Sequence, residues 1–423
     1  MLDIKFIREN LDSVKQGAKN KRINIDIERL MEIDATLKPM KQELEELQHK
    51  RNTLSKTIGR APTEEREPIK KQVIEIKQQM EKIEQGLQPL EFELKELMLC
   101  TPQPAREDVP VGKDDTDNIE VKTWGTLPKF DFKIKDHVEL GTLHDILDIP
   151  GGVKLAGSRS YILKGAGAIL EQAVMRFTYD KLIKKGYTPM SVPVLVSESC
   201  MEGTGYFPTG RDQAYFIEKD NLALVGTSEV PLTSYFSNEI LNHNQLPQRV
   251  MAQSSCFRRE AGTYGKDTHG LYRVHQFQKI EQVIIGPADK ESSEQLHNEL
   301  LNNAEELMQD LGLPYRVVYV CTGDLGMGQL RKHDIETWMP SRNLYSETHS
   351  CSTFHDYQSR RLMMRYKDEN GKTHYCHTLN NTAIASPRVL IPLLETHQQE
   401  DGTVVIPECL HPYTGGLKEL KVS

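Results

Sequence analysis

Residues 255–282, SCFRREAGTYGKDTHGLYRVHQFQKIEQ, place charged side chains at alternate positions on both sides of a glycine-containing loop. Alternate side chains of a β-strand share one face, so a hairpin here would gather them on a single surface. Arginines bind phosphates through paired hydrogen bonds, and an exposed ring among charges is suited to stacking on a nucleotide base. The segment therefore predicts a nucleotide site. Its members are Arg258, Glu260, Arg273, His275, Phe277, Lys279 and Glu281.

A salt-bridged strand pair facing solvent is the alternative interpretation of this segment. Phe277 argues against it, because a single ring among charges has no core to join. Glycine-rich motifs of the P-loop or Rossmann type do not occur in the sequence. Any phosphate would therefore be held by side chains.

The composition limits the class of protein. The 423 residues, 38% of them hydrophobic, suffice for two or three domains. The net charge of −8 gives no general support for a nucleic-acid partner, so such a partner would need a local patch. The sequence has neither a long apolar run nor a signal peptide, so we expect a cytoplasmic protein with no membrane association. Its seven cysteines form no CxxC pair, and HYCH (374–377) lacks the second ligand pair of a zinc site.

Two heptad repeats occupy most of the first hundred residues. Their apolar positions alternate in spacing between three and four, over about four heptads each. The loop GRAPTEER (59–66), with Gly59 and Pro62, predicts that they pair as an antiparallel hairpin with arms of about 45 Å. The seams are Leu30, Ile33, Leu37, Met40, Leu44, Leu47, Arg51, Leu54 and Ile58, and then Ile69, Val73, Ile76, Met80, Ile83, Leu87, Leu90, Leu94 and Leu97.

The heptads alone favour a solvated spacer or a dimerising coiled coil. The alternative is an arm that contacts a long polyanion through basic side chains near its tip. Those side chains are Lys50, Arg51, Lys56, Arg60, Lys70 and Lys71.

The rest of the chain mixes helical and extended patterns. Helices are predicted at about 165–185 and 288–311, strands at 315–321 and 362–368, and a hairpin turn at Asn370-Gly371. Such a mixture predicts an α+β fold, with an antiparallel sheet flanked by helices. We expect residues 1–107 to form an N-terminal domain with the helical arm at about 27–100, residues 108–125 to be a linker rich in Pro, Asp and Gly, and residues 126–423 to form the larger domain.

Five ordered motifs and the heptad hairpin resemble those of seryl-tRNA synthetases of the bacterial and organellar type, a class II aminoacyl-tRNA synthetase family. Residues 256–281 resemble motif 2, and YTPMSVPVLV (187–196) resembles motif 1 with Pro193 as its proline. GTSEVPLT (226–233) resembles the serine-binding TxE motif. SETHSCSTFHDYQSRR (346–361) and HTLNNTAIASPRVLIPLLE (377–395) resemble the ATP/metal segment and motif 3. The class I signatures HIGH and KMSKS are missing.

The resemblance implies a serine–tRNA ligase that uses ATP to form seryl-adenylate and then charges tRNA-Ser, with tRNA-Sec as an open second substrate. It also implies Mg²⁺, a class II catalytic domain, a tRNA-binding arm, and a homodimer with Pro193 at the interface. No general base is needed, because alignment and charge neutralisation can carry the first step. Two alternatives are a paralogue that loads an amino acid on a carrier protein and a non-charging tRNA-binding regulator. The intact arm argues against the first, and the retained motif residues argue against the second.

Roles follow from the resemblance one position at a time. Arg258 would contact the α-phosphate, and with Arg388 it is the predicted catalytic residue. Arg273 would hold the outer phosphates, and Phe277 would stack on the base. The predicted ATP-binding set is Arg258, Arg259, Glu260, Arg273, Phe277, Glu347, Thr348, His349, Ser350 and Arg388, with Glu347 and Ser350 also contacting Mg²⁺. The predicted serine-binding set is Thr227, Ser228, Glu229, Glu281, Asn380 and Thr382, and such a site would reject alanine.

Several positions depart from the family pattern. GTSEV stands for the usual PTAEV, ETHS for EISS, LNNTA for LNGSG, and Gln278 for an aspartate. His349 is expected near the phosphates, where it could titrate near neutrality. All these positions keep polar function, so we expect an active but divergent member: an organellar-type enzyme, a second copy or an inhibitor-tolerant paralogue.

Overall fold

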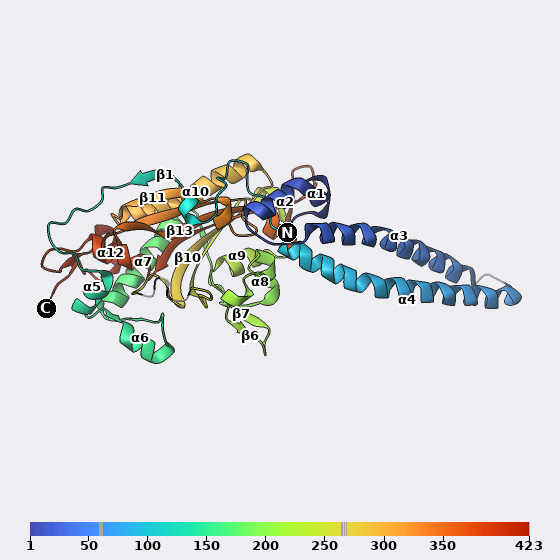
Figure 1. The fold of residues 1–423 in the computed structure, drawn as a ribbon, viewed down its shortest axis with the longest axis horizontal. Helices are drawn as coiled ribbons and strands as arrows, with labels where there is room; N and C mark the ends of the chain where they lie inside the picture. The colour runs from blue at the N-terminus through green and yellow to red at the C-terminus, as the bar shows by residue number, and fades with distance from the viewer. Residues whose placement is uncertain (59–61, 264, 266, 268, 423) are drawn as a thin grey trace. The chain divides into compact units, whose positions relative to one another are not determined.

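The computed structural model describes residues 1–58, 62–263, 265, 267 and 269–422 (Figure 1). It contains two compact units. One comprises residues 2–19 and 23–102, and the other comprises residue 1, residues 20–22 and residues 103–423. The predicted turn residue Gly59 and the predicted polyanion contact Arg60 lie outside the described residues.

The first unit contains the heptad hairpin. Its helices are α1 (Ile4–Glu9), α2 (Leu11–Asn20), α3 (Ile27–Ile58) and α4 (Thr63–Cys100). Seam residues Ile33, Leu37 and Leu87 are buried between α3 and α4, with the neighbouring seam positions packed around them. Arg29 on α3 also donates two hydrogen bonds of 2.8 Å to Glu93 on α4. The predicted antiparallel helical hairpin is therefore confirmed.

The basic side chains near the tip of the hairpin are available to a partner in different degrees. Lys50, Lys56, Lys70 and Lys71 are exposed, and Arg51 is half-buried. Lys70 is engaged in an ion pair of 2.6 Å with Glu67. The polyanion contact itself stays a prediction.

The second unit is built on an eight-stranded sheet of order β1-β11-β12-β13-β16-β10-β9-β4. All neighbours are antiparallel except β4 and β9. This confirms the predicted α+β fold, and Pro189 lies on the edge strand β4. The strands are β1 (Ile119–Trp124), β4 (Thr188–Pro189), β9 (Gln248–Phe257), β10 (Gln276–Gly286), β11 (Tyr315–Tyr319), β12 (Arg331–Met339), β13 (Leu344–His355) and β16 (His377–Ser386).

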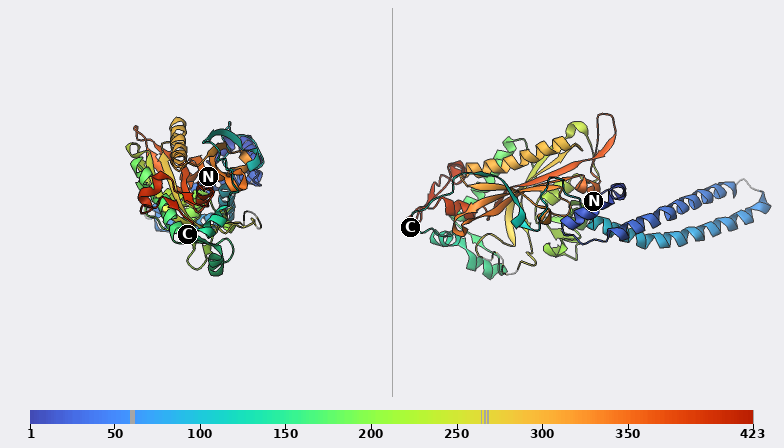
Figure 2. Two further views of the ribbon diagram at one scale, coloured as in Figure 1. Left: turned by 90° about the vertical axis from the view of Figure 1, so that its left-hand side faces the viewer. Right: turned by 45° about the horizontal axis from the view of Figure 1, so that its top comes forward.

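Helices cover the two faces of this sheet differently. Figure 2 shows α10 lying along one face, where α7 and α12 also pack in the main hydrophobic core. On the opposite face, α9 and α11 pack near β10 through Leu232 and Leu362. No helix in the described ranges has the length and apolarity needed to cross a membrane. The helices are α5 (His137–Leu143), α6 (Ile149–Ala156), α7 (Ala166–Lys184), α8 (Glu198–Thr204), α9 (Glu229–Ser234), α10 (Lys290–Asp310), α11 (Tyr357–Leu362) and α12 (Leu390–Thr396).

Short strands and 3-10 turns complete the second unit. The strands form small sheets: β5 (Leu195–Ser197) with β6 (Phe216–Ile217) and β7 (Leu222–Leu224), β8 (Ile240–Asn242) with β14 (Arg365–Lys367) and β15 (Thr373–Tyr375), β2 (Leu147–Asp148) with β3 (Ile162–Leu163), and β17 (Val404–Val405) with β18 (Glu419–Leu420). The 3-10 turns are η1 (Asp115–Asp117), η2 (Arg211–Gln213), η3 (His243–Gln245), η4 (Thr322–Asp324), η5 (Pro340–Arg342) and η6 (Glu408–Tyr413).

The segment expected as a linker, 108–125, differs from the prediction. Its second half forms β1, an edge strand that pairs with β11 through an irregular register. All six residues of β1 are exposed, but the ring of Trp124 stacks on Tyr315 with centroids 5.7 Å apart. The prediction of a linker relied on the Pro, Asp and Gly content of the segment. It overlooked a short run of β-branched and aromatic residues, which are typical of a strand.

Candidate active site

The charged segment 255–282 forms a hairpin with strands β9 and β10, which pair antiparallel. On β10, Ile280 and Ile284 enter the core beneath α10, whereas Val283 and Ile285 pack on the α9 side. Phe277, Lys279 and Glu281 continue the second set by alternation. The predicted shared face of these three side chains is therefore confirmed.

The alternation does not extend through the ends of the hairpin. β10 begins at Gln276, so Arg273 and His275 precede the strand. Glu260 has a positive φ of 54°, which ends the extended chain beyond Arg258. His275 does not join the other charges: its Nδ1 lies 2.9 Å from the carbonyl oxygen of Arg258, and its ring lines a neighbouring hollow with Tyr215.

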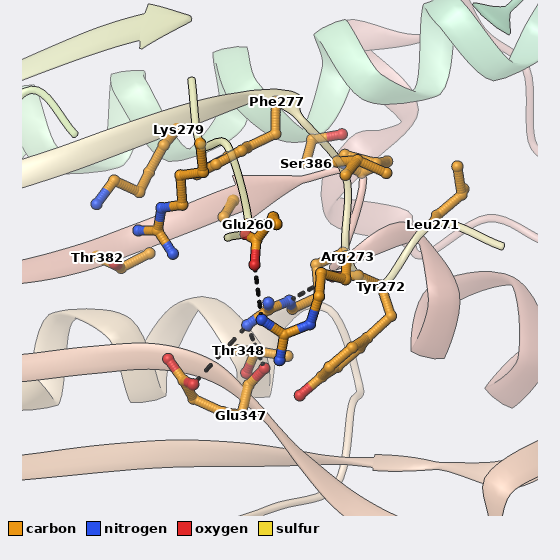
Figure 3. Close-up of a pocket in the computed structure, with 15 residues that line it drawn as sticks. Glu260, Leu271, Tyr272, Arg273, Phe277, Lys279, Glu347, Thr348, Thr382 and Ser386 are labelled. Carbon is orange, nitrogen blue, oxygen red and sulfur yellow. Dashed lines mark hydrogen bonds and ion pairs between the residues drawn. The ribbon is translucent and has the colours of Figure 1, made fainter. Parts of the chain in front are cut away.

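A polar cleft opens on the hairpin face that carries Phe277 and Lys279 (Figure 3). Most of the predicted nucleotide residues line it, together with residues that the sequence did not single out. The lining consists of Arg258, Glu260, Leu271, Tyr272, Arg273, Val274, Phe277, Lys279, Glu347, Thr348, Thr382, Ala385, Ser386, Pro387 and Arg388. The elements that bring them together are β10, β13, β16 and the segments flanking the hairpin loop.

One end of the cleft is rich in arginine. The Arg258 guanidinium lies 5.1 Å from the centre of the Phe277 ring, and no residue in the described part of the chain forms an ion pair with it. Arg273 donates a 2.7 Å hydrogen bond to Glu260, while its buried Nε has no partner among the described residues. A buried donor without an acceptor is costly, so this nitrogen suits an anionic ligand.

Arg388 also lines the cleft. Its Nε donates to the carbonyl oxygen of Tyr272 at 3.2 Å, and another nitrogen donates to that of Glu347 at 2.9 Å. The Tyr272 ring lies 4.3 Å from the Arg388 guanidinium and 4.6 Å from that of Arg342. Tyr272 therefore orients Arg388. Sequence analysis missed it because it lies out of phase with Arg273 and Phe277.

Glu347 extends into the cleft from β13 with half of its side chain exposed. Desolvation acts to raise its pKa, but the positive charges of Arg388 and Lys332 outweigh this and hold the pKa below its ordinary value. An irregular register at Thr348 adds one residue to β13 opposite β12. Glu347 and Ser350, three positions apart, thereby come to the same face, where Ser350 bonds Asp334.

These two oxygen ligands fit Mg²⁺, which takes few protein ligands and completes its octahedron with phosphate and water. The described residues contain no group of three His, Cys, Asp or Glu side chains that could hold a metal by themselves. The donor set is therefore suited to a cation that arrives with a nucleotide. It does not suit a structural metal.

Two buried carboxyl groups, Glu229 on α9 and Glu281 on β10, lie near the cleft residue Lys279 but are not part of the cleft lining. Glu281 forms an ion pair with Lys279 and accepts a 3.2 Å hydrogen bond from the hydroxyl of Thr227. Glu229 accepts hydrogen bonds from Tyr206 and from Gln358. Burial, followed by repulsion from Glu281, raises the pKa of Glu229 to about 7.

The sequence analysis did not identify Tyr206 or Gln358 as site residues. Both are far from Glu229 in the sequence and approach it only in the folded chain. Gln358 lies in the segment that resembles the ATP/metal motif, so the resemblance pointed to its neighbourhood but not to its role.

Comparison with known proteins places the chain in a family. Residues 1–104 match the model of the seryl-tRNA synthetase N-terminal domain, and residues 215–397 match the class II tRNA synthetase core domain (G, H, P, S and T). The serine–tRNA ligase of Deinococcus radiodurans is 45% identical over 420 residues, covering 99% of both chains. This chain belongs to the seryl-tRNA synthetase family. A ligase from Treponema denticola is 42% identical, covering 98% of this chain and 99% of its own.

The fold also matches that of the family. The crystal structure of seryl-tRNA synthetase from Pyrococcus horikoshii complexed with ATP has a TM-score of 0.91, with 37% identity and all of both chains covered. The cytoplasmic serine–tRNA ligase of Naegleria fowleri, solved with AMP, has a TM-score of 0.87 and 29% identity over 100% of this chain and 99% of its own.

Positions that depart from the family pattern mostly face away from the cleft. The Ser228 hydroxyl donates to the carbonyl oxygen of Ala252 at 3.2 Å, and the Gln278 amide donates to Ser255 at 2.8 Å. Asn381 donates to the carbonyl oxygen of Leu300 on α10 at 2.7 Å. Thr348 and Thr382 are departures that do line the cleft, and both carry a hydroxyl group.

His349 differs from its expectation. It pairs in register with Ile335, a core residue, and is buried on the helix-covered face of the sheet. Burial lowers the pKa of His349 to about 4, so its ring stays neutral near pH 7. The extra residue at Thr348 reverses the alternation beyond Glu347. The expectation that His349 lies near the phosphates came from its place in the resembling motif, which does not show this reversal.

The other predicted residues that do not line the cleft are Arg259, Ser350, Thr227, Ser228, Glu229, Glu281 and Asn380. Arg259 is exposed and donates to the carbonyl oxygen of Asp212 at 3.3 Å. Asn380 is buried on β16, two positions before the cleft residue Thr382. Their contacts with ATP and serine stay predictions.

Proposed function

We propose that the cleft activates L-serine with ATP and that the serine is then transferred to the 3′ end of tRNA-Ser. Serine–tRNA ligation is the activity of this aminoacyl-tRNA synthetase, whose match to the Deinococcus radiodurans ligase covers 99% of both chains. The observation that carries the assignment is a pairing of two features. Arginines line the cleft together with Phe277, and two buried carboxyl groups lie beside the cleft, near Lys279.

The arginine-rich end suits ATP. We assign the base to Phe277 and Arg388, which both line the cleft, and the phosphates to Arg258 and Arg273. Serine's carboxylate oxygen forms a bond to the α-phosphorus, and the bond from that phosphorus to the bridging oxygen breaks, releasing pyrophosphate. Arg258 would offset the charge that develops on the α-phosphate, and fixed guanidinium groups need no reorganisation to do so.

Glu347 and Ser350 would hold Mg²⁺ together with the phosphates of the nucleotide. When bound, the ion neutralises phosphate charge. The low pKa of Glu347 keeps its carboxylate ionised and ready for a cation.

The pair of buried carboxyl groups, Glu229 and Glu281, suits serine. Glu281 is already neutralised by Lys279, so Glu229 is the carboxylate left to balance the ammonium group. Glu281, Thr227 and Thr382 remain to hydrogen-bond the hydroxyl. Substrates without that hydroxyl would leave these groups unpaired, which costs affinity for alanine and glycine.

We assign residues 1–107 to tRNA binding through the α3–α4 arm and residues 126–423 to catalysis. We also propose a homodimer. Exposed apolar side chains at Ile169 and Ile183 of α7 and at Leu195, close to Pro193, support an interface there. A cytoplasmic location and charging of tRNA-Sec stay predictions.

ATP–pyrophosphate exchange tests the activity. Exchange should depend on serine and be absent with alanine, glycine and threonine. Charging of purified tRNA-Ser should follow, while a carrier protein should receive no serine. Exchange with none of the four amino acids would refute the proposed function, and loading of the carrier protein alone would favour the paralogue.

Deleting residues 30–97 tests the arm. Exchange should stay within about twofold of the intact protein, because the cleft contains none of these residues. Charging of tRNA-Ser should be lost. Charging that survives the deletion would contradict the role of the arm and leave the role of the cleft intact.

A further inference from the structure

Glu229 is a buried carboxylate whose direct hydrogen-bond partners are neutral groups. Its side chain is 5% exposed at the start of α9. Oε2 accepts a 2.7 Å hydrogen bond from the Tyr206 hydroxyl, and Oε1 accepts a 2.8 Å hydrogen bond from the Gln358 amide. Each oxygen thus has its own donor, and together they fix the position of the carboxylate.

The Gln358 amide is itself fixed. Its Oε1 accepts a 2.6 Å hydrogen bond from the Thr378 hydroxyl, and its Nε2 also donates to the carbonyl oxygen of Thr204 at 3.0 Å. Because the amide oxygen is occupied by a donor, the NH₂ group must face Glu229. A chain of hydrogen bonds therefore runs from Thr378 on β16 through Gln358 on α11 to the carboxylate.

The charged neighbours of Glu229 do not favour its ionised form strongly. Glu281 on β10 repels it, and Lys279 on the same strand is paired with Glu281. Burial is the largest influence and raises the pKa of Glu229, while the hydrogen bonds from Tyr206 and Gln358 lower it. The pKa of Tyr206 is itself raised well above its ordinary value, first by burial, so its hydroxyl remains a donor.

We propose that Tyr206 and Gln358 are positioning residues that keep Glu229 ionised and directed at the ammonium group of the substrate. This inference rests on the proposed function of the cleft. The two residues set the affinity for serine. They leave the rate of seryl-adenylate formation unchanged, because neither lines the arginine-rich cleft. Thr378 acts one step further away by orienting the amide.

The test is serine-dependent ATP–pyrophosphate exchange between pH 6 and 8.5 in the full-length protein and in Tyr206→Phe and Gln358→Met. Each substitution should raise the KM for serine about tenfold, because hydrogen bonds to charged groups are among the stronger ones. The pH midpoint of serine affinity should move up by about one unit, and kcat at saturating serine should stay within about twofold.

Matched controls separate this role from a structural one. Tyr187→Phe removes a similar hydrogen bond, 2.9 Å to Glu299 on α10, and Gln398→Met removes a buried amide bonded to Lys135. Both controls should keep the wild-type pH midpoint. If Gln358→Met fails to fold, the milder Tyr206→Phe decides. Unchanged KM and midpoint in a folded Tyr206→Phe would overturn the inference, as would a fall in kcat without a shift of the midpoint. A wild-type protein without exchange would instead refute the proposed function.

Discussion

The pKa values of two carboxyl groups, one beside the cleft and one in its lining, are shifted in opposite directions. Glu229 is buried among neutral donors and a second acid, and its pKa is raised to about 7. Glu347 is half exposed among Arg388, Lys332 and Arg258, and its pKa is lowered. Fixed cations therefore outweigh desolvation at Glu347, whereas burial and the neighbouring acid dominate at Glu229. Under the proposed function, the ammonium group of serine would supply the missing positive charge at Glu229.

The largest effect should follow from removing a fixed cation of the cleft lining. Arg258→Ala should lower the rate of ATP–pyrophosphate exchange by about 10²–10³, because it removes preorganised stabilisation of the α-phosphate. Steady-state exchange kinetics measure this loss. Arg365→Ala is the control and should change the rate less than twofold, since Arg365 donates to the carbonyl oxygen of Met363 outside the cleft. Equal losses in both variants would show that total charge matters and position does not.

The next effect should come from removing the charge of Glu229 beside the cleft. Glu229→Gln should raise the KM for serine about 100-fold, since breaking a buried charge pair costs about 2–5 kcal/mol. ATP affinity, measured by equilibrium binding without serine, should not change. A comparable loss of ATP affinity would contradict the assignment of Glu229 to serine binding alone.

A smaller effect should follow from Glu347→Gln. Removing this carboxylate should raise the half-saturating Mg²⁺ concentration about tenfold, which is within the usual range for loss of a group that supports a metal site. Titration of exchange activity with Mg²⁺ gives the half-saturating concentration. The KM for serine at saturating Mg²⁺ should remain that of the wild type, and a parallel change in both constants would argue against a metal role for Glu347.

The smallest effect should be that of pH. Below about pH 7 Glu229 takes up a proton and loses its charge, so ammonium binding weakens as pH falls. Serine affinity, measured by calorimetry without nucleotide, should drop about tenfold from pH 8 to pH 6, one power of ten for the unit below the pKa. In Glu229→Gln the profile should be flat over this range. A flat profile in the wild type would show that Glu229 is not the counter-ion.

Sequence patterns predicted the parts of the molecule that depend on local periodicity. The heptads specified the α3–α4 hairpin, and period-two alternation placed Phe277, Lys279 and Glu281 on one face. Alternation failed at Glu260, where a positive φ ends the extended chain, and the resemblance gave no sign that β13 gains a residue at Thr348. Period counting assumes a regular strand and so cannot detect either departure.

Residues brought in from distant segments were also beyond the sequence. Tyr206 follows α8 and Gln358 lies on α11, so their approach to Glu229 depends on how α8, α9 and α11 pack. Tyr272 was missed for a related reason, because its role depends on Arg342 and Arg388, which reach it from η5 and the start of α12. The resemblance supplied the family motifs, but these partners required coordinates.

The extra residue in β13 decides which side chains of this segment share a face. It allows the acid and the hydroxyl, three positions apart, to point the same way, while the position between Thr348 and Ser350 is turned into the interior. A substitution at that interior position, His349, therefore changes no side chain of the cleft lining. On a regular strand, two side chains three positions apart would face opposite sides of the sheet, so the shared face of Glu347 and Ser350 depends on the extra residue. Any site that uses both oxygens therefore requires this irregularity, whichever side chain occupies the interior position.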